Sequence, residues 1–561
     1  MEDATSTTPF ASPDVQPPTP TRLRPLRTAS WREACNEASL LSPLAAGFSR
    51  SLADGLSRRS MALPLLEDEK AGEAQEGTAN EWSCYQKELA RVLRLALPLS
   101  VTNLTGFALG LITISFVGRL GEHELSVAIL ATSIFNVTGL SLLIGFAAAM
   151  ETFCGQAFGA GSYRLVGVVL QRAIILTSLL VLAVAVLWSQ AERLLLLLGQ
   201  NGPISAGAAR YLHLAIPALY FTGLFEAFKR YLMAQGAVRP ATAVTLLALA
   251  LAPLYNYLLI YRLGWGLDGA ALAVDAIQAT MALALGGYIA VRDVRRRSHP
   301  MSTWKGWSLE AFRGWGGYFR FALPSVAMIC CEWWTFEAVI IMSGWLPDPD
   351  VSVAVMGIAI NLSGVVYMMI TGLAMAASVR VSNSLGAGRP RSARRATLTA
   401  LCLTLGLELV CGVTVFAARH QLPYLFTSIP GVVSLTVTVL PIFAISLPGD
   451  GVNAVLQGAG KQELGAVTNI CSYWGCGLPL AATFAFKLHM GVKGLWWGLV
   501  AVNTLQGALM LLIALRFDFA KESEKAQARF QDRDEDLVEP LLEQGGEQLQ
   551  ASGLAVGDGL S

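Results

Sequence analysis

The sequence predicts an all-α integral membrane protein with twelve transmembrane helices, arranged as two pseudo-symmetric six-helix lobes around a central cleft. Three observations indicate this fold class. The 561 residues are 54% hydrophobic and only 14% charged, whereas a soluble domain carries about 25% charged residues. Long apolar runs follow one another through the middle of the chain. Landmarks in the first half of that middle recur in the second half.

The two ends of the chain differ from this apolar middle. Residues 1–88 and 516–561 together hold 38 of the 81 charged side chains. The first end mixes Pro, Ser, Thr and Arg without a helical or strand period, and the last end is rich in Glu, Gln and Asp. Such compositions bury too little apolar surface to fold alone. We therefore expect disordered cytoplasmic tails over residues 1–85 and 517–561.

Apolar runs bounded by Gly, Pro or charged residues define the expected spans. Each run is long enough to cross a hydrocarbon layer, which takes about 20 helical residues. In the N-lobe, residues 86–300, the expected spans are 92–118, 126–150, 166–188, 207–233, 240–262 and 268–291. In the C-lobe, residues 301–516, they are 318–344, 351–378, 395–417, 429–457, 463–486 and 494–515. The run 191–199 is too short to cross, so we expect it to lie at the interface.

The distribution of Lys and Arg predicts the orientation. With a cytoplasmic N-terminus, the inner loops hold 17 of these residues and the outer loops hold 6. Cytoplasmic loops carry the excess of Lys and Arg in membrane proteins. Both termini are therefore expected in the cytoplasm, in agreement with an even number of spans. The membrane of residence stays open between the plasma membrane and the vacuolar membrane.

The two halves of the apolar middle repeat each other. Matching landmarks are separated by 224 to 227 residues. The matched landmarks are Leu97-Pro98 with Leu323-Pro324, GQAFGAG (155–161) with SNSLGAG (382–388), Pro217 with Pro441, and Gly266-x-x-Gly269 with Gly491-x-x-Gly494. Because each unit has six helices, both copies share one orientation, and a substrate cleft is expected between them. This is the architecture of a transporter.

Several other functions are disfavoured. The net charge of +1 offers no basic field for nucleic acid. The nine cysteines lie mostly inside apolar runs, without the close spacing that metal ligation needs. No G-x-S-x-G, H-E-x-x-H or paired-His motif occurs, so an enzyme is not expected. We expect no metal and no cofactor, and the expected partners are a small organic solute and the lipid bilayer, with a monomer as the default state.

Four segments resemble the multidrug and toxin extrusion (MATE) family, most closely its plant and algal detoxification branch. They are FNVTG (135–139), CGQAFGAG (154–161), EWWTFE (332–337) and AASVRVSNSLGAG (376–388). The resemblance covers about residues 86–516. It implies an efflux antiporter that exchanges protons or sodium for small organic solutes such as xenobiotic cations or secondary metabolites. The alternative is a lipid-linked saccharide flippase of the same superfamily, for which we expect a strongly cationic cleft.

Ionisable residues in the spans are the candidates for ion coupling, because they are costly in hydrocarbon. Glu332 matches the acidic position of the family's C-lobe cation site. Glu337 matches a second acidic position in animal members; five residues from Glu332, it lies roughly 140° away around the helix. Asn361 stands where animal members place another Glu, and an amide can hydrogen-bond a protonated carboxyl group.

Asp450 matches the other acid of this site in the plant branch, with a departure from the family pattern. The following Gly-x-Gly comes about four residues sooner than in the family. Either a deletion after Asp450 leaves the site intact, or the acid is shifted by about one helical turn, roughly 6 Å.

Aromatic residues around these groups are the candidates for solute binding. Trp333, Trp334, Phe336 and Tyr367 suit flat or cationic solutes through stacking and cation–π attraction. The alternative is that these rings pack against neighbouring helices or lie at the membrane interface. Asn136, in the FNVTG segment, is expected to line the cleft from the first half.

Four further acids lie in the spans, namely Glu151, Glu226, Asp275 and Glu408. Glu226 is the first-half counterpart of Asp450. Lys229 and Arg230 follow it at i+3 and i+4, where a helix presents them beside the carboxylate. A satisfied ion pair is therefore favoured over an ion-coupling role for Glu226.

Overall fold

The computed structural model describes residues 81–447 and 453–529, and all secondary structure in these residues is helical. The predicted all-α fold is thus confirmed. Nine helices of this part of the chain are long and apolar enough to cross a membrane. Residues 1–80 and 530–561 of the expected tails lie outside the described residues.

The first half holds six helical passages. Their elements are α4 (Glu81–Val117), α5 (Glu122–Phe135), η1 (Asn136–Leu140), α6 (Ser141–Gly159), α7 (Tyr163–Trp188), α8 (Ala191–Leu197), α9 (Gly202–Leu214), α10 (Ile216–Ala234), α11 (Arg239–Asn256), η2 (Tyr257–Arg262) and α12 (Gly266–Arg295). Passage four breaks between α9 and α10 at Ala215. Pro217 then falls in the first turn of α10, where its missing N–H costs no hydrogen bond.

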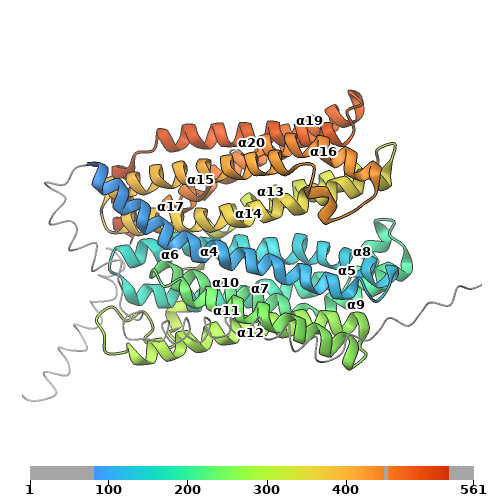
Figure 1. Ribbon diagram of the computed structural model, residues 1–561. Coiled ribbons are helices and arrows are strands. Elements are labelled where there is room, and N and C mark those ends of the chain that lie inside the picture. Colours follow the sequence, from blue (N-terminus) through green and yellow to red (C-terminus); the bar gives the residue numbers. More distant parts are fainter. Residues whose placement is uncertain (1–80, 448–452, 530–561) are drawn as a thin grey trace, which may run out of the picture. The chain divides into compact units, whose positions relative to one another are not determined.

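The second half repeats this order. Its elements are η3 (Leu309–Phe312), α13 (Trp315–Ser343), α14 (Pro349–Gly386), α15 (Pro390–Ala418), η4 (Leu422–Leu425), α16 (Pro430–Ser446), α17 (Asn453–Ala459), α18 (Gln462–Asn469), η6 (Ile470–Gly477), α19 (Leu478–Ala482), η7 (Thr483–Lys487) and α20 (Val492–Leu515). Apart from residues 448–452, every expected span falls on these helical segments. Figure 1 shows the long helices running side by side, with α4–α12 on one side and α13–α20 on the other.

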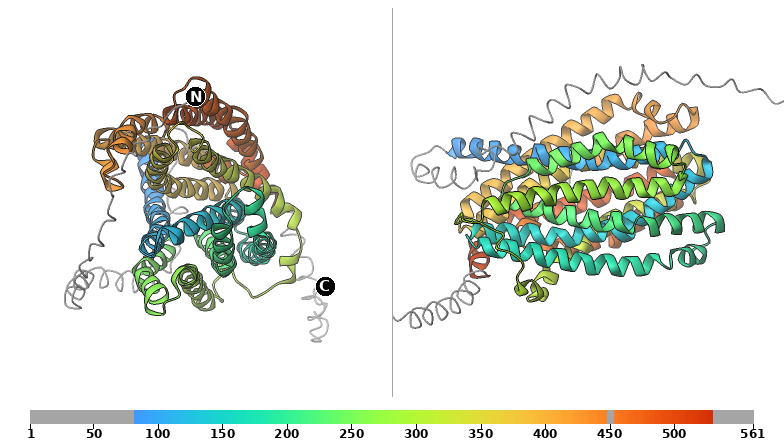
Figure 2. Two further views of the ribbon diagram at one scale, coloured as in Figure 1. Left: turned by 90° about the vertical axis from the view of Figure 1, so that its right-hand side faces the viewer. Right: turned by 90° about the horizontal axis from the view of Figure 1, so that it is seen from below.

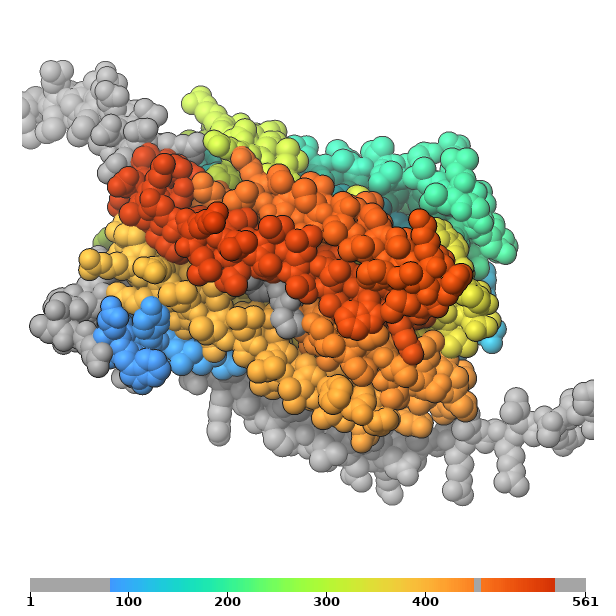
Figure 3. Space-filling model, turned by 90° about the horizontal axis from the view of Figure 1, so that it is seen from above, coloured from blue at the N-terminus to red at the C-terminus, as the bar shows by residue number. Residues whose placement is uncertain are grey.

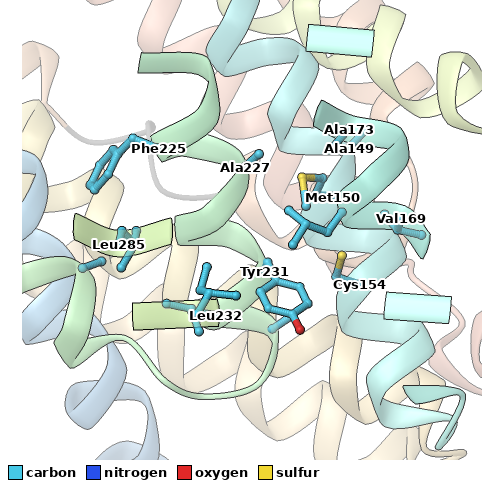
Figure 4. Close-up of a cluster of buried hydrophobic side chains, with 14 of the residues drawn as sticks. Ala149, Met150, Cys154, Val169, Ala173, Phe225, Ala227, Tyr231, Leu232 and Leu285 are labelled. Carbon is cyan, nitrogen blue, oxygen red and sulfur yellow. The ribbon is translucent and has the colours of Figure 1, made fainter. Parts of the chain in front are cut away.

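Each half has its own apolar core. In the first half, Met150 and Cys154 of α6 pack in one cluster with Tyr231 and Leu232 of α10 (Figure 4). In the second half, α16 and α20 meet through the rings of Phe443 and Trp496, whose centroids are 5.3 Å apart. The cluster of the first half also includes Tyr318 and Phe321 of α13, so buried apolar packing joins the two halves as well.

The halves meet where α6 crosses α13 and where α14 crosses α4. Gly145 of α6 lies directly against the backbone of Val326 in α13, and Gly372 of α14 lies against Ser100 in α4. These two contacts are repeat counterparts of each other. Helix backbones approach this closely only where a residue lacks a large side chain. The pseudo-symmetry expected from the sequence thus extends to the contacts between the lobes.

Both ends of the described chain lie at one end of the bundle, which we call the terminal side (Figure 3). There α6 and α14 close against each other. A Cβ atom on Gly159 would collide with the carbonyl oxygen of Asn383, and one on Gly386 would collide with that of Gln156. These reciprocal contacts leave no passage between the two helices.

One expectation for the C-terminal tail is wrong in part. Residues 519–529, which we expected to be disordered, form a helix. Phe519 and Ala526 on this helix are buried in a cluster with Val381 and Leu385 of α14. Packing against the lobe provides the apolar burial that its composition alone does not predict. At the other end, residues 81–85 belong to α4 rather than to a tail.

Candidate functional site

A cavity of about 560 Å³ lies between the two halves. Its wall includes residues from Thr102 to Val117 of α4 and from Ile360 to Met375 of α14. These stretches are the half of α4 farther from the terminal side and the middle of α14. The crossing of Gly159 and Gly386 therefore lies nearer the terminal side than the cavity does.

The cavity brings together seven of the nine residues that the sequence indicated for coupling and solute binding. They are Asn136, Glu332, Trp333, Phe336, Glu337, Asn361 and Tyr367. All except Asn136, Asn361 and Tyr367 come from one segment of α13. Asp450 lies outside the described residues.

Glu332 lies in the middle of α13 with only 7% of its surface exposed. Beside it, Trp333 Nε1 donates to the hydroxyl of Tyr367 in α14 at 3.4 Å. This bond ties the aromatic wall of α13 to the neighbouring helix. A carboxyl group in such a place is shielded from bulk water while still reaching the cavity.

Glu337 also lines the cavity, although it lies well round the helix from Glu332. Its carboxylate accepts a hydrogen bond of 2.9 Å from Ser133 of α5. Glu337 therefore faces the first half, and the cavity extends around α13 to meet both carboxyl groups. The two acids contact different surroundings, as their spacing suggested.

Asn361 presents its side chain to the cavity from α14. Its amide nitrogen donates to the carbonyl oxygen of Gly357, one turn earlier, at 2.8 Å. This bond holds the amide against its own helix. Asn361 and Glu332 line the same cavity, and the role of Asn361 as a second polar member of the site stays a prediction.

Trp334 departs from the expectation, because it is not among the residues that line the cavity. Its indole nitrogen donates to the carbonyl oxygen of Val137 at 3.0 Å, and 36% of its surface is exposed. One residue rotates a helix by 100°. That rotation turns Trp334 away from the wall that Trp333 forms, toward the backbone of η1.

The first half contributes a buried charge cluster to the same cavity. Glu226 and Lys229 of α10 both line it, and Lys229 Nζ lies 2.6 Å from a Glu226 oxygen. Arg230 pairs with Glu226 and also lies 3.2 Å from Glu151 of α6. The expected pairing of Glu226 with Lys229 and Arg230 is confirmed. The contribution of Glu151 was not expected, because helical spacing cannot show a pairing between two helices.

Asp275 has a structural contact instead of a place in the cavity wall. Its carboxylate accepts a hydrogen bond of 2.7 Å from the backbone N–H of Ala218. That N–H lies in the first turn of α10, where it has no partner within its own helix. Glu408 is buried in α15 and is likewise absent from the residues that line the cavity.

Gln278 is a polar residue of the wall that the sequence reading missed. Its side-chain carbonyl oxygen is buried, and among the described residues it has no hydrogen-bond partner. Its only signal in the sequence was a single amide within the apolar run 268–291. Over residues 81–447 and 453–529, no group of three or more His, Cys, Asp or Glu side chains could hold a metal ion.

Comparison with known proteins agrees with this architecture. The MatE family model matches residues 98–258 and 324–483, and the second match begins 226 residues after the first. Protein DETOXIFICATION 16 of Arabidopsis thaliana is 35% identical over 80% of this chain and 93% of its own length. Multidrug and toxin extrusion protein 1 of Xenopus tropicalis is 34% identical over 80% of this chain and 77% of its own length.

Among solved structures, the crystal structure of the eukaryotic MATE transporter AtDTX14 superposes with a TM-score of 0.75 at 32% identity. The match covers 79% of this chain and 99% of that chain.

Proposed function

The chain belongs to the MATE transporter family, and on that premise we propose that it is a secondary active exporter that exchanges protons for small organic solutes. The observation that supports this most is the position of Glu332. It is a buried carboxyl group in the wall of a cavity between two lobes, next to the aromatic ring of Trp333. Aromatic walls with few polar groups are typical of small-molecule sites.

The proposed cycle rests on competition at this carboxylate. A negative charge on Glu332 attracts an organic cation, whose ring stacks on Trp333, Phe336 or Tyr367. A proton on Glu332 removes the charge and releases the solute. The two ligands thus bias opposite states of the same transporter, which is the condition for coupling.

The charges of the cavity wall favour cationic solutes. Among the described residues that line it, three are acidic and one is basic, namely Glu226, Glu332, Glu337 and Lys229. Lys229 is already paired with Glu226. The flippase alternative predicts a strongly cationic cleft, so these charges disfavour it.

We further propose that the terminal side faces the cytoplasm, in the plasma membrane or the vacuolar membrane, and that the protein works as a monomer. The closed contact between α6 and α14 supports an outward-facing arrangement of the two lobes. Glu88 of α4 strengthens this closure, because Arg380 of α14 donates to it at 2.8 and 3.1 Å.

The test is uptake of a fluorescent organic cation into liposomes that contain the purified protein. An imposed pH gradient is expected to drive uptake, and Glu332→Gln is expected to abolish it. The matched control is Glu463→Gln, an exposed carboxylate outside the cavity, which should leave uptake unchanged. Uptake driven only by a sodium gradient would show that the coupling ion is sodium instead of the proton. Gradient-driven uptake that persists in Glu332→Gln would contradict the proposed role of Glu332.

A further inference from the structure

The connection between α12 and α13 exposes large apolar side chains beside basic ones. We call residues 301–313 the interfacial loop. Trp307, Leu309 and Phe312 are 68%, 81% and 61% exposed, and Lys305 and Arg313 are exposed beside them. A loop in water does not ordinarily present three such side chains within six residues. Figure 2 shows this connection, in yellow-green, on the outside of the bundle.

The interfacial loop lies along the flank of α7 rather than beyond its end. Thr303 packs so closely on Gly167 that a Cβ atom there would collide with its carbonyl oxygen. Gln171 lies eight residues into α7, and Arg172, which donates to the carbonyl oxygen of Glu310 at 3.2 Å, lies nine residues in. With a rise of 1.5 Å per residue, these contacts lie roughly 6–14 Å inside the terminal end of α7.

At that depth the backbone of the loop needs its own hydrogen-bond partners. Gln171 supplies two of them, because its Nε2 donates to the carbonyl oxygen of Gly306 at 2.7 Å and its Oε1 accepts from Ser308 N at 2.8 Å. Irregular backbone at membrane depth is tolerated only where the protein satisfies its polar groups. The two hydrogen bonds of Gln171 meet this condition.

The charged residues of the loop also suit contact with a negatively charged surface. Glu310 is the one acidic residue between positions 301 and 313, and it pairs with Arg164 of α7. Lys305 and Arg313 thus remain as the outward charges of the loop, and Arg295 and Arg297 at the end of α12 are exposed as well. Long basic side chains can keep their charge at the lipid headgroups while their stems cover apolar surface.

We propose that the interfacial loop binds anionic phospholipid of the cytoplasmic leaflet. Trp307, Leu309 and Phe312 enter the boundary between headgroups and acyl chains, where aromatic residues are enriched. Lys305 and Arg313 contact the lipid phosphates, aided by Arg295 and Arg297. The loop thereby anchors the flank of α7. The proposal depends on the terminal side being cytoplasmic, but on neither the substrate nor the coupling ion.

The test measures the thermal unfolding midpoint of the detergent-purified, full-length protein during titration with phosphatidylserine or phosphatidylcholine. A ligand that binds the folded state raises the midpoint by mass action. We expect phosphatidylserine to raise it at lower concentration than phosphatidylcholine. A basic residue near an anionic lipid surface contributes about 1 kcal/mol, roughly fivefold in affinity. The double variant Lys305→Gln/Arg313→Gln should therefore need roughly 25-fold more phosphatidylserine.

The matched control is Arg391→Gln/Arg394→Gln, which removes two exposed arginines at the start of α15. This control should keep the wild-type response, and Trp307→Ala should weaken the response to both lipids.

An equal loss in the two double variants would overturn the proposal, as would equal responses of the wild type to both lipids. Stabilisation by water-soluble glycerophosphoserine to the same extent would also overturn it, because the site would then bind a free phosphate ester. A Trp307→Ala variant that responds like the wild type would overturn the proposal too, because the exposed ring would then not contribute to lipid binding. None of these readouts requires transport.

Discussion

Trp333 and Trp334 are neighbours in the sequence but lie in different surroundings. Trp333 lines the cavity and bonds Tyr367, whereas Trp334 lies outside the wall and bonds Val137. The sequence could place both on α13 through the EWWTFE segment. It could not show which of them faces the cavity, because the rotation of α13 depends on how Gly145 and Val326 bring the lobes together.

This difference makes the two residues a matched pair for mutation. Trp333→Ala should raise the KM for an aromatic cation by about 2- to 30-fold, since a cation–π contact contributes about 0.5–2 kcal/mol. Trp334→Ala should leave the KM unchanged. Initial rates of uptake over a range of solute concentrations measure both effects. An equal increase in the two variants would show that neither ring acts by direct contact.

Glu226 is expected to matter for stability more than for coupling. Its carboxylate lies between Lys229 and Arg230 with all three side chains buried. Removing one partner of a buried charge pair leaves the other uncompensated. Glu226→Gln should therefore lower the free energy of unfolding by about 3 kcal/mol, seen as a lower unfolding midpoint in detergent. A variant with an unchanged midpoint and no transport would assign Glu226 to the transport chemistry instead.

At the scale of elements, the crossing of α6 and α14 closes the terminal side. The motifs GQAFGAG and SNSLGAG were visible in the sequence as repeat landmarks. Their reciprocal contact was not, because repetition indicates equivalent positions without showing that they touch. The π-helical stretches η2 and η7 illustrate the same limit. Each follows a proline, Pro253 or Pro479, at the same repeat position, yet their hydrogen-bond pattern depends on packing.

Alanine at the crossing should open the terminal side. Gly159→Ala and Gly386→Ala each place a methyl group against a carbonyl oxygen of the facing helix. Each variant should lower the unfolding midpoint. Each should also let a membrane-impermeant reagent reach the cavity from the terminal side. Gly287→Ala in α12 is the control, because nothing lies within 4 Å of its Cβ position. Wild-type behaviour of both crossing variants would show that the helices tolerate the added methyl groups.

The helix over residues 519–529 joins the two lobes at the terminal side. Arg529 donates to Gln156 of α6 at 3.0 Å, and Ser523 donates to the carbonyl oxygen of Leu385 in α14 at 3.0 Å. The composition of residues 519–529 resembles that of the rest of the charged tail. The sequence therefore shows no helical period that distinguishes this helix from the residues after it. Its apolar positions became evident only from the surface on which it packs.

Attachment of this helix should depend on pH through Glu522. Burial acts to raise the pKa of Glu522, but hydrogen bonds from Lys525 and Lys461 outweigh it and lower that pKa below its ordinary value of 4.5. Because the folded-state pKa is depressed, the stabilisation is present above pH 4.5 and is lost as the pH falls through the lowered value. Limited proteolysis after residue 516 should accelerate only in that acidic range. Glu522→Gln should remove this dependence, and a transition near pH 7 would contradict the assignment.

At the scale of the whole molecule, the two repeats together line a cavity between them. The sequence predicted both the duplication and the number of passages, because period and hydropathy are properties of the chain itself. The resemblance to the MATE family pointed to most of the cavity residues. Which end of the cavity is closed is a property of one conformation, and it depends on contacts between lobes that no local pattern contains.

The central claim is that a proton and the solute compete for Glu332. The most direct test is proton release when an organic cation binds to the purified protein in weakly buffered detergent solution. The wild type and Glu463→Gln should release protons on binding, and Glu332→Gln should bind the cation without releasing any. Equal proton release from Glu332→Gln and the wild type would contradict the claim and place the coupling proton on another group.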